Sequence, residues 1–315
     1  MPLFRTIKRG YHWGWSLPRC GFCFVKGVMD KFNLFRPWIF EKYTRYSFKD
    51  WLKTSDDGSA YFDFKGAKIP YIEPKKNACI YETMQAVFQD TFGIYCLYDD
   101  HYTPSIVKKL DPISSDGPYG YTDGSFDVTV KEGDVVIDAG AWIGDFSAYA
   151  AAKKAVCYAF EPLADTYALL QATAAMNNTD AIYIIPVDKG LSDRVGWTSM
   201  DAGNDGSGAG ASMEKVVEGA VESAVESGIA VTTIDEFVKA QGLQRVDFIK
   251  ADIEGAERDM LRGARETLKR FAPKLAICTY HLPDDPQVLE QIIKEANPDY
   301  TVVHTRHKLM AMVVK

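Results

Sequence analysis

Several features of secreted and membrane proteins are missing from this sequence of 315 residues. No run of about 18 uncharged apolar residues occurs, so we expect no membrane-spanning helix. The basic start is not followed by a clean apolar segment with a small-residue cleavage site, which argues against a secretory signal. The six cysteines are scattered, and Cys157 and Cys278 lie in apolar strand-like runs, as expected for reduced thiols. These absences predict a cytoplasmic globular protein.

The common phosphate-binding signatures are missing too. No G-K-[ST] sequence follows a glycine-rich loop, which excludes a Walker A loop. The stretch "DAGAWIG" has the spacing D-x-G-x-x-x-G from Asp138 through Gly140 to Gly144, whereas dinucleotide-binding turns have G-x-G-x-x-G. Trp142 places a bulky side chain where a pyrophosphate would lie. This turn is therefore poorly suited to NAD or FAD.

Charge and aromatic residues are distributed unevenly. Residues 1–60 hold 11 Lys and Arg against 5 Asp and Glu, and the rest holds 25 against 38. The first 53 residues contain 14 of the 40 aromatic residues. This asymmetry predicts an N-terminal α+β extension over residues 1–115 and a main domain over residues 116–315. The extension is expected to pack on the main domain. Alternatively, residues 1–60 contact a membrane surface or a glycan carrier. The extension could also serve as an active-site cap or as the arm of a homodimer.

The main domain alternates between strand and helix patterns. Apolar strands are predicted at residues 135–138, 156–160, 182–187, 246–251, 274–279, 300–304 and 309–314. Helices are predicted at residues 145–153, 164–176, 233–240, 257–270 and 286–295. This alternation predicts an α/β fold with a mostly parallel seven-stranded sheet. Only "TRHK" separates the last two strands, so the last strand is expected to be antiparallel. Residues 201–228 begin with a Gly/Ser-rich stretch and predict a mobile loop, either a substrate lid or a tolerated insertion.

A ligand with an adenosine but no phosphate suits the glycine turn, and S-adenosylmethionine is such a ligand. Asp138 at the strand end is predicted to accept a hydrogen bond from its ammonium group, directly or through water. Gly140 permits the tight turn and Gly144 permits close packing of the helix, with Ala141 and Trp142 completing the turn.

Two further acids support this hypothesis. Glu161 ends the next strand, in "YAFEP", where a carboxylate can bind both ribose hydroxyls before Pro162 starts a helix. The alternative is an acid that only stabilises the first turn of that helix. Asp188 ends the third strand and is a candidate for the adenine amino group, or a loop acid beside Lys189. The cofactor prediction depends on the turn and Glu161 together.

With these motifs in place, the sequence resembles the FkbM family of S-adenosylmethionine-dependent methyltransferases. The resemblance is carried, in order, by "VVIDAGAWIGDFS", "AFEP", "GLSD", "TTIDEF", "VDFIKADIEGAE", "MLRGARETL" and "PKLAICTYH". It implies a class I methyltransferase (Rossmann-like) fold and methyl transfer to a hydroxyl oxygen of a sugar, glycan or secondary metabolite. The N-terminal residues lie outside it.

The fourth predicted strand ends in polar residues that face the expected ligand crevice. Alternation places Lys250, Asp252 and Glu254 on one side, next to His281 at the end of the fifth strand. His281 is a candidate general base because an ordinary imidazole titrates near neutrality, and Asp252 orients it or is itself the base. Asp252 is also predicted to contact the cofactor. For Glu254 and Glu257, stabilisation of the next helix is the alternative role.

No metal is expected, because the fifth strand offers "TYH" rather than a second acid beside Asp252. The "CGFC" pair, Cys20 and Cys23, is interpreted as incidental. Two other functions stay open: a non-catalytic S-adenosylmethionine-binding module, and a nucleic-acid methyltransferase. The acidic main domain and the lack of an N/D-P-P-Y motif oppose the second, so no nucleic acid partner is expected.

Overall fold

The computed structural model describes residues 51–72, 119–201, 212–213, 216–218, 228–305 and 307–314. The chain divides into two compact units, Met1–Leu52 and Lys53–Lys315, and nearly all described residues belong to the second. The expected domain boundary near residues 113–117 and the "CGFC" pair lie outside the described residues. The architecture below is that of the second unit.

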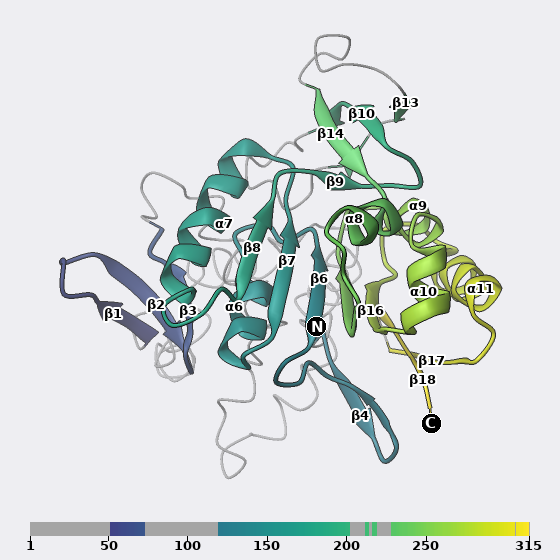
Figure 1. Cartoon of the computed structure of the whole chain (residues 1–315), viewed down its shortest axis with the longest axis horizontal. Helices are drawn as coiled ribbons and strands as arrows, with labels where there is room; N and C mark the ends of the chain where they lie inside the picture. The colour runs from purple at the N-terminus through teal and green to yellow at the C-terminus, as the bar shows by residue number, and fades with distance from the viewer. Residues whose placement is uncertain are drawn as a thin grey trace, which may run out of the picture. The chain divides into compact units, whose positions relative to one another are not determined.

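A seven-stranded sheet forms the centre of this unit (Figure 1). Its strands are β6 (Val135–Ala139), β7 (Val156–Phe160), β8 (Ile184–Val187), β15 (Phe248–Ala251), β16 (Lys274–Cys278), β17 (Tyr300–His304) and β18 (Lys308–Val313). Their order is β17-β18-β16-β15-β6-β7-β8. β18 runs antiparallel to both neighbours, whereas the pairs among β16, β15, β6, β7 and β8 are parallel. The predicted mostly parallel sheet with an antiparallel last strand is confirmed.

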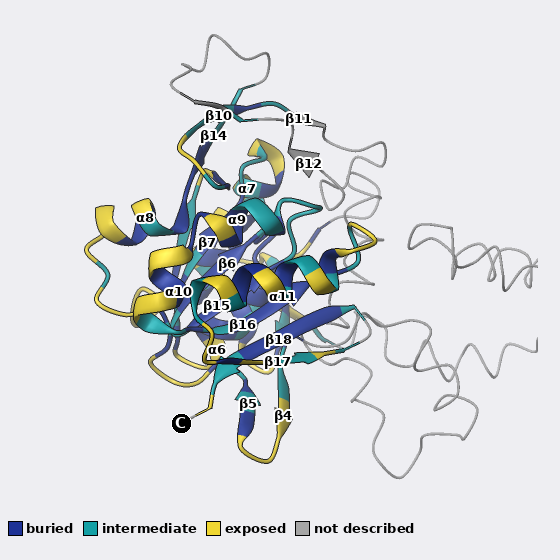
Figure 2. Ribbon diagram, turned by 90° about the vertical axis from the view of Figure 1, so that its right-hand side faces the viewer, coloured by how far each residue is buried: buried dark blue, intermediate teal, exposed yellow. Residues whose placement is uncertain are grey.

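Strand alternation sends apolar side chains to both faces of the sheet. The helices are α6 (Asp145–Ala152), α7 (Ala164–Asn177), α8 (Ile234–Ala240), α9 (Glu257–Arg262), α10 (Arg265–Phe271) and α11 (Asp285–Ala296). Ile137 and Ala139 pack in one cluster with residues of α8 to α11. Val136 and Phe248 point the other way and pack with Phe146 of α6. The inner strands are therefore buried between layers, as the dark colour of β15 and β16 behind the helices shows (Figure 2).

The helix predicted over residues 257–270 is divided in two. α9 ends at Arg262 and α10 begins at Arg265, with Gly263 between them. A Cβ at Gly263 would lie 2.1 Å from the carbonyl oxygen of Ser192. This close approach requires glycine at position 263. The break itself is held by Asp235, whose N–H donates to Gly263 O at 3.0 Å and whose carboxylate accepts from Glu266 N and Thr267 N.

A small second sheet, in the order β13-β10-β14-β9, lies beside the helices. It consists of β9 (Gly190–Leu191), β10 (Gly196–Thr198), β13 (Val217–Glu218) and β14 (Ile229–Thr232), with β11 (Met200–Asp201) and β12 (Ser212–Met213) pairing nearby. Short pieces of the expected loop over residues 201–228 are thus strands. Most of that loop lies outside the described residues, so a lid stays a prediction.

Two hairpins precede the central sheet. β2 (Ala60–Phe64) and β3 (Ala67–Pro70) follow β1 (Leu52–Thr54), and β4 (Tyr121–Asp123) pairs with β5 (Phe126–Val128). β3 docks on α7, where the Asn177 side chain accepts from Lys68 N at 3.0 Å and donates to Lys68 O at 2.7 Å. Among the described residues before 116, the hairpin of β2 and β3 therefore packs on α7. In the part of the chain that the structure describes, no helix is long and apolar enough to cross a membrane.

Candidate active site

The glycine turn, residues 138–144, joins β6 to α6 and packs closely against the residues that follow β15. Gly140 has a φ of 73°, and a Cβ there would lie 2.2 Å from the carbonyl oxygen of Asp252. Gly144 has a φ of 86°, and its Cβ would lie 2.8 Å from Leu170 of α7. The Ala141 N–H donates to Phe160 O at 2.8 Å, which ties the turn to β7. Both glycines are thus required by backbone conformation and by space.

Asp138, predicted to bind the ligand, is fully buried and lies within an internal ion pair. Its Oδ2 accepts from Ser147 Oγ at 2.6 Å, and its Oδ1 lies 3.1 Å from Lys250 Nζ. The same ammonium donates to Gly140 O at 2.8 Å. Burial opposes the charge of Lys250, but Asp138 and then Asp252 outweigh burial and raise its pKa. Lys250 therefore links the glycine turn to β15, a role that the sequence did not suggest.

Glu161 lies beside the glycine turn, just after β7, and is 6% exposed. Its Oε2 accepts from Trp142 N at 2.9 Å, and its Oε1 accepts from Leu163 N at 2.9 Å and Thr166 Oγ at 2.8 Å. Burial raises the pKa of Glu161 to about 7, against the opposing effect of these hydrogen bonds. A carboxylate offers about four acceptor positions, so these contacts leave one on Oε2. This acid stabilises the start of α7 and retains one acceptor position, and its contact with a ribose stays a prediction.

The other two residues predicted near the cofactor are less enclosed. Pro162 is partly buried between β7 and α7, which begins at Ala164. Asp188 is exposed after β8, where its charge adds to burial in raising the pKa of Tyr167. Their contacts with a cofactor stay predictions.

On the neighbouring strand ends, Asp252 is held by two phenols. Tyr119 donates to its Oδ2 at 2.6 Å and Tyr280 to its Oδ1 at 2.8 Å. Burial and then the charge of Asp252 raise the pKa of Tyr119. The Lys250 and Lys308 ammonium groups lie 5.2 and 4.5 Å from the centre of the Tyr119 ring. Tyr119 lies 133 positions before Asp252, and no motif in "GPYGYTDG" indicated this contact.

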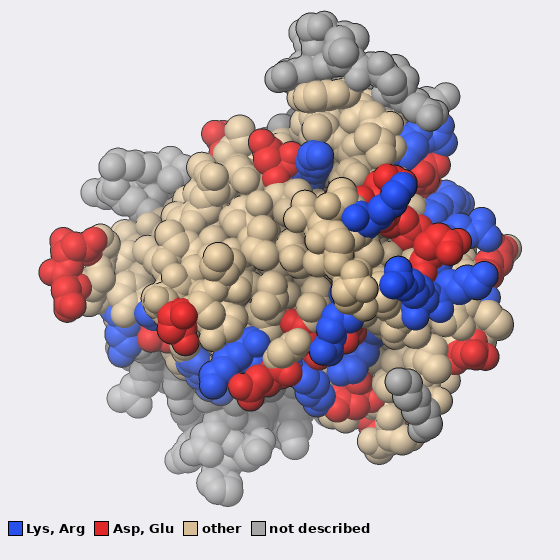
Figure 3. Space-filling view, in the orientation of Figure 1, with Lys and Arg blue, Asp and Glu red and all other residues tan. Residues whose placement is uncertain are grey.

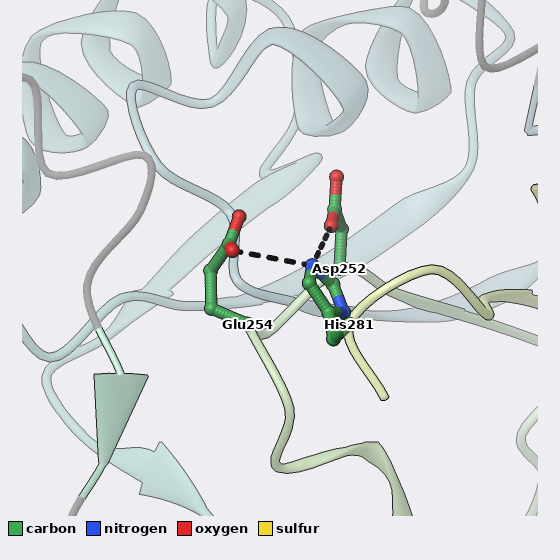
Figure 4. A group of neighbouring side chains, drawn as sticks. All are labelled: Asp252, Glu254 and His281. Atoms are coloured by element: carbon green, nitrogen blue, oxygen red, sulfur yellow. Dashed lines mark ion pairs between the residues drawn. The ribbon is translucent and has the colours of Figure 1, made fainter. Parts of the chain in front are cut away.

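His281 is surrounded by carboxylates, which together form the acid cluster of Asp252, Glu254, Glu257 and His281. Its Nε2 lies 3.2 Å from Glu254 Oε2 and 3.5 Å from Asp252 Oδ1 (Figure 4). Its Nδ1 lies 2.9 Å from Glu257 Oε1. Burial opposes the charged ring, but Glu254 and Glu257, followed by Asp252, raise the pKa of His281 to about 10. A ring that keeps its proton at neutral pH cannot take a second one, so Asp252 is the better placed of the two predicted bases in this arrangement.

The turn after β15 places Glu254 and Glu257 around the imidazole. Glu254 and Gly255 have φ values of 53° and 103°, which reverse the chain before α9. Glu257 accepts from Ile253 N at 2.9 Å and Gly255 N at 3.0 Å, and it is fully buried. Glu257 therefore holds the turn that precedes α9 and also faces His281. A positive φ at a residue other than glycine costs free energy, and such strained residues cluster at functional sites.

The sheet order, the glycine turn and the acids at the strand ends define a class I methyltransferase fold. A protein-family model described as "Methyltransferase FkbM domain" matches residues 138–300, which is more than half of the sequence. The chain therefore belongs to the FkbM methyltransferase family, as the sequence motifs predicted.

Three proteins similar to this chain are described next, in order of decreasing sequence identity. Hexuronic acid methyltransferase AglP of Haloferax volcanii is 28% identical over 168 residues, which are 53% of this chain and 64% of that protein. This chain thus matches less than two thirds of its relative. The crystal structure of methyltransferase FkbM from Methylobacillus flagellatus is 22% identical with a TM-score of 0.46, over 80% of this chain and 62% of that one. Fibrillarin of Aeropyrum pernix with natively bound S-adenosyl-L-methionine is 14% identical, with a TM-score of 0.35. The match covers 58% of this chain and 67% of the fibrillarin chain.

Proposed function

We propose that this methyltransferase uses S-adenosylmethionine to methylate a hydroxyl oxygen of a sugar, a glycan or a secondary metabolite. One observation carries the proposal: the glycine turn and the acid cluster are adjacent. Lys250 bonds the turn at Gly140 O, and Asp252 O is the atom that a Cβ at Gly140 would meet at 2.2 Å. A donor held at the turn would therefore lie next to groups that can orient an acceptor.

The residues of the turn fit an adenosine without phosphates. Glu161 keeps an acceptor position for a ribose hydroxyl, and Gly140, Ala141 and Trp142 form the floor of the turn. When bound, S-adenosylmethionine supplies an electrophilic methyl group. The protein then has to align the acceptor oxygen and remove its proton, because a neutral hydroxyl is a poor nucleophile. Asp252, whose direction is fixed by Tyr119 and Tyr280, is the proposed proton acceptor.

The proposed acceptor class follows from the relative and from the charge pattern. A sugar hydroxyl is consistent with the name of the relative, a hexuronic acid methyltransferase. On the face seen in Figure 3, the middle is largely uncharged, and basic and acidic side chains are mixed along its right side and lower edge. A nucleic-acid enzyme is expected to present a continuous basic stripe instead. We therefore favour a small-molecule or glycan acceptor over a nucleic acid.

The first test is calorimetric titration of the full chain with S-adenosylhomocysteine, with NAD as the control. Micromolar binding of S-adenosylhomocysteine alone supports the cofactor; binding of NAD instead contradicts it. The second test is transfer of labelled methyl from S-adenosylmethionine to sugars, hexuronic acids and glycans. An O-methyl ether survives mild alkali, whereas a methyl ester is released as methanol, so the product identifies the acceptor oxygen. Cofactor binding without transfer to any acceptor would favour the non-catalytic binding module.

The proposals for the N-terminal extension are separate. Residues 1–115 are proposed to pack on the main domain, with a homodimer arm or peripheral membrane contact as alternatives. Light scattering of the full chain distinguishes a monomer from a homodimer. Flotation with anionic vesicles, with neutral vesicles as the control, measures membrane contact.

A further inference from the structure

The acid cluster has the composition of a metal site. Asp252 and Glu254 follow β15, and His281 follows β16, so the three side chains come from neighbouring strand ends and point toward one another (Figure 4). One ligand atom from each lies within 4.8 Å of the others. Two carboxylates and an imidazole can together bind hard and borderline divalent cations.

His281 provides an independent sign of a missing partner. Its side chain is 7% exposed, and among the described residues Nε2 has no hydrogen bond of normal geometry. Two carboxylate oxygens nevertheless lie 3.2 and 3.5 Å from Nε2. Oxygens close to Nε2 but not aligned with an N–H group fit a common cation better than a hydrogen bond.

Glu257 completes the pattern on the other side of the ring. Its Oε1 lies 2.9 Å from Nδ1, and two backbone N–H groups hold the carboxylate in place. A histidine that binds a metal through one nitrogen generally has its other nitrogen oriented by a carboxylate or carbonyl. Glu257 is thus placed to turn Nε2 of His281 toward Asp252 and Glu254.

We propose that Asp252, Glu254 and His281 bind a divalent cation, which would take the place of the proton on His281 Nε2, with Glu257 as the positioning residue for His281. Asp252 would bind the cation through Oδ1, the oxygen nearer His281, and keep Oδ2 as the proposed proton acceptor. The proposal revises the expectation of a metal-free site, which had looked for a second acid on the fifth strand. That acid comes instead from Glu254, two positions after Asp252 on the turn. The role of the cation rests on the proposed function: it would bind and orient an oxygen of the acceptor beside the methyl donor.

The test is Mn²⁺ binding by the full chain after chelator treatment, measured from the electron paramagnetic resonance signal of free Mn²⁺. We expect one Mn²⁺ per chain in the wild type and at least tenfold weaker binding in Glu254→Gln. Glu257→Gln should weaken binding by about 10- to 100-fold if it positions the histidine. Glu266→Gln, which removes an exposed acid of α10, is the matched control and should bind as the wild type does.

Titration of the same samples with S-adenosylhomocysteine separates this proposal from the proposed function. Retained S-adenosylhomocysteine binding in Glu254→Gln shows that the variant is folded. Wild-type protein that binds S-adenosylhomocysteine but takes up no Mn²⁺ at millimolar concentration overturns the metal site alone. Equal Mn²⁺ binding by wild type and Glu254→Gln overturns it as well, because the cation would then be bound elsewhere.

Discussion

The glycine turn and the acid cluster lie side by side but are stabilised in different ways. At the turn, each acid has partners of its own: Asp138 accepts from Ser147 and forms an ion pair with Lys250, and Glu161, beside the turn, accepts from three donors. In the cluster, three carboxylates face one imidazole. Like charges at this distance repel, so the cluster needs a cation, either a proton on His281 or a metal. The glycine turn is therefore preformed by its backbone geometry, whereas the acid cluster depends on the cation that it binds.

The largest expected effect is on the chemistry of the acid cluster. Asp252→Asn keeps the size of the side chain but removes its ability to take a proton, so kcat should fall by about 10²- to 10⁴-fold. S-adenosylhomocysteine affinity should stay close to that of the wild type, because the turn is unchanged. Turnover is measured with the acceptor found in the methyl-transfer screen. Asp259→Asn, an exposed acid paired with Arg262, is the control, and equal turnover in both variants would contradict the role of Asp252.

The ion pair between the two regions should dominate stability. Lys250→Met leaves Asp138 buried and uncompensated, which should lower the free energy of unfolding by about 3–5 kcal/mol. Adding Asp138→Asn should recover part of this loss, since the uncompensated charge is then gone. Arg245→Met breaks the exposed pair with Asp247 and should cost less than about 1 kcal/mol. Urea denaturation measures all three, and a small loss in Lys250→Met would mean that the pair does not hold the turn.

Two costs of replacing a glycine can be measured separately: the steric contact of the new Cβ and the strain of a positive φ. Gly140→Ala should lower the free energy of unfolding by about 3 kcal/mol, because its Cβ meets a backbone oxygen and its φ is positive. Gly124→Ala has a φ of 62° but nothing within 4 Å, so it should cost only about 1 kcal/mol. Equal losses in the two variants, measured by urea denaturation, would show that the contact with Asp252 is relaxed easily.

The smallest expected effect is the pH dependence of cofactor binding. A ribose hydroxyl donates to the ionised form of Glu161, so binding favours ionisation and should strengthen as pH rises through about 7. With a pKa near 7, S-adenosylhomocysteine should bind about tenfold more tightly at pH 8 than at pH 6. Glu161→Gln should bind more weakly at pH 8 and lose most of this dependence. Calorimetry at both pH values tests this, and stronger binding at pH 6 in the wild type would reverse the assignment.

The sequence predicted the sheet more completely than the site. Strands with apolar residues on both faces are recognisable because a parallel sheet buries both, and the short link "TRHK" can only make a hairpin. The helix over residues 257–270 was predicted without its break, because the contacts at the break come from distant segments, Asp235 and Ser192. Local sequence patterns indicate helical periodicity, but they do not show which distant segment of the chain contacts the helix.

By itself the sequence determined the fold class, the family and the glycine turn, since these follow from local spacing and from motifs that are contiguous in the chain. Only the tertiary structure decided what surrounds each acid. It brought Tyr119 to Asp252 and Lys250 to Asp138, and it placed Glu257 against the histidine ring. The physical reason is that a side chain's ionisation and hydrogen bonding depend on burial and on neighbours from other strands. The spacing of residues along one strand does not contain that information.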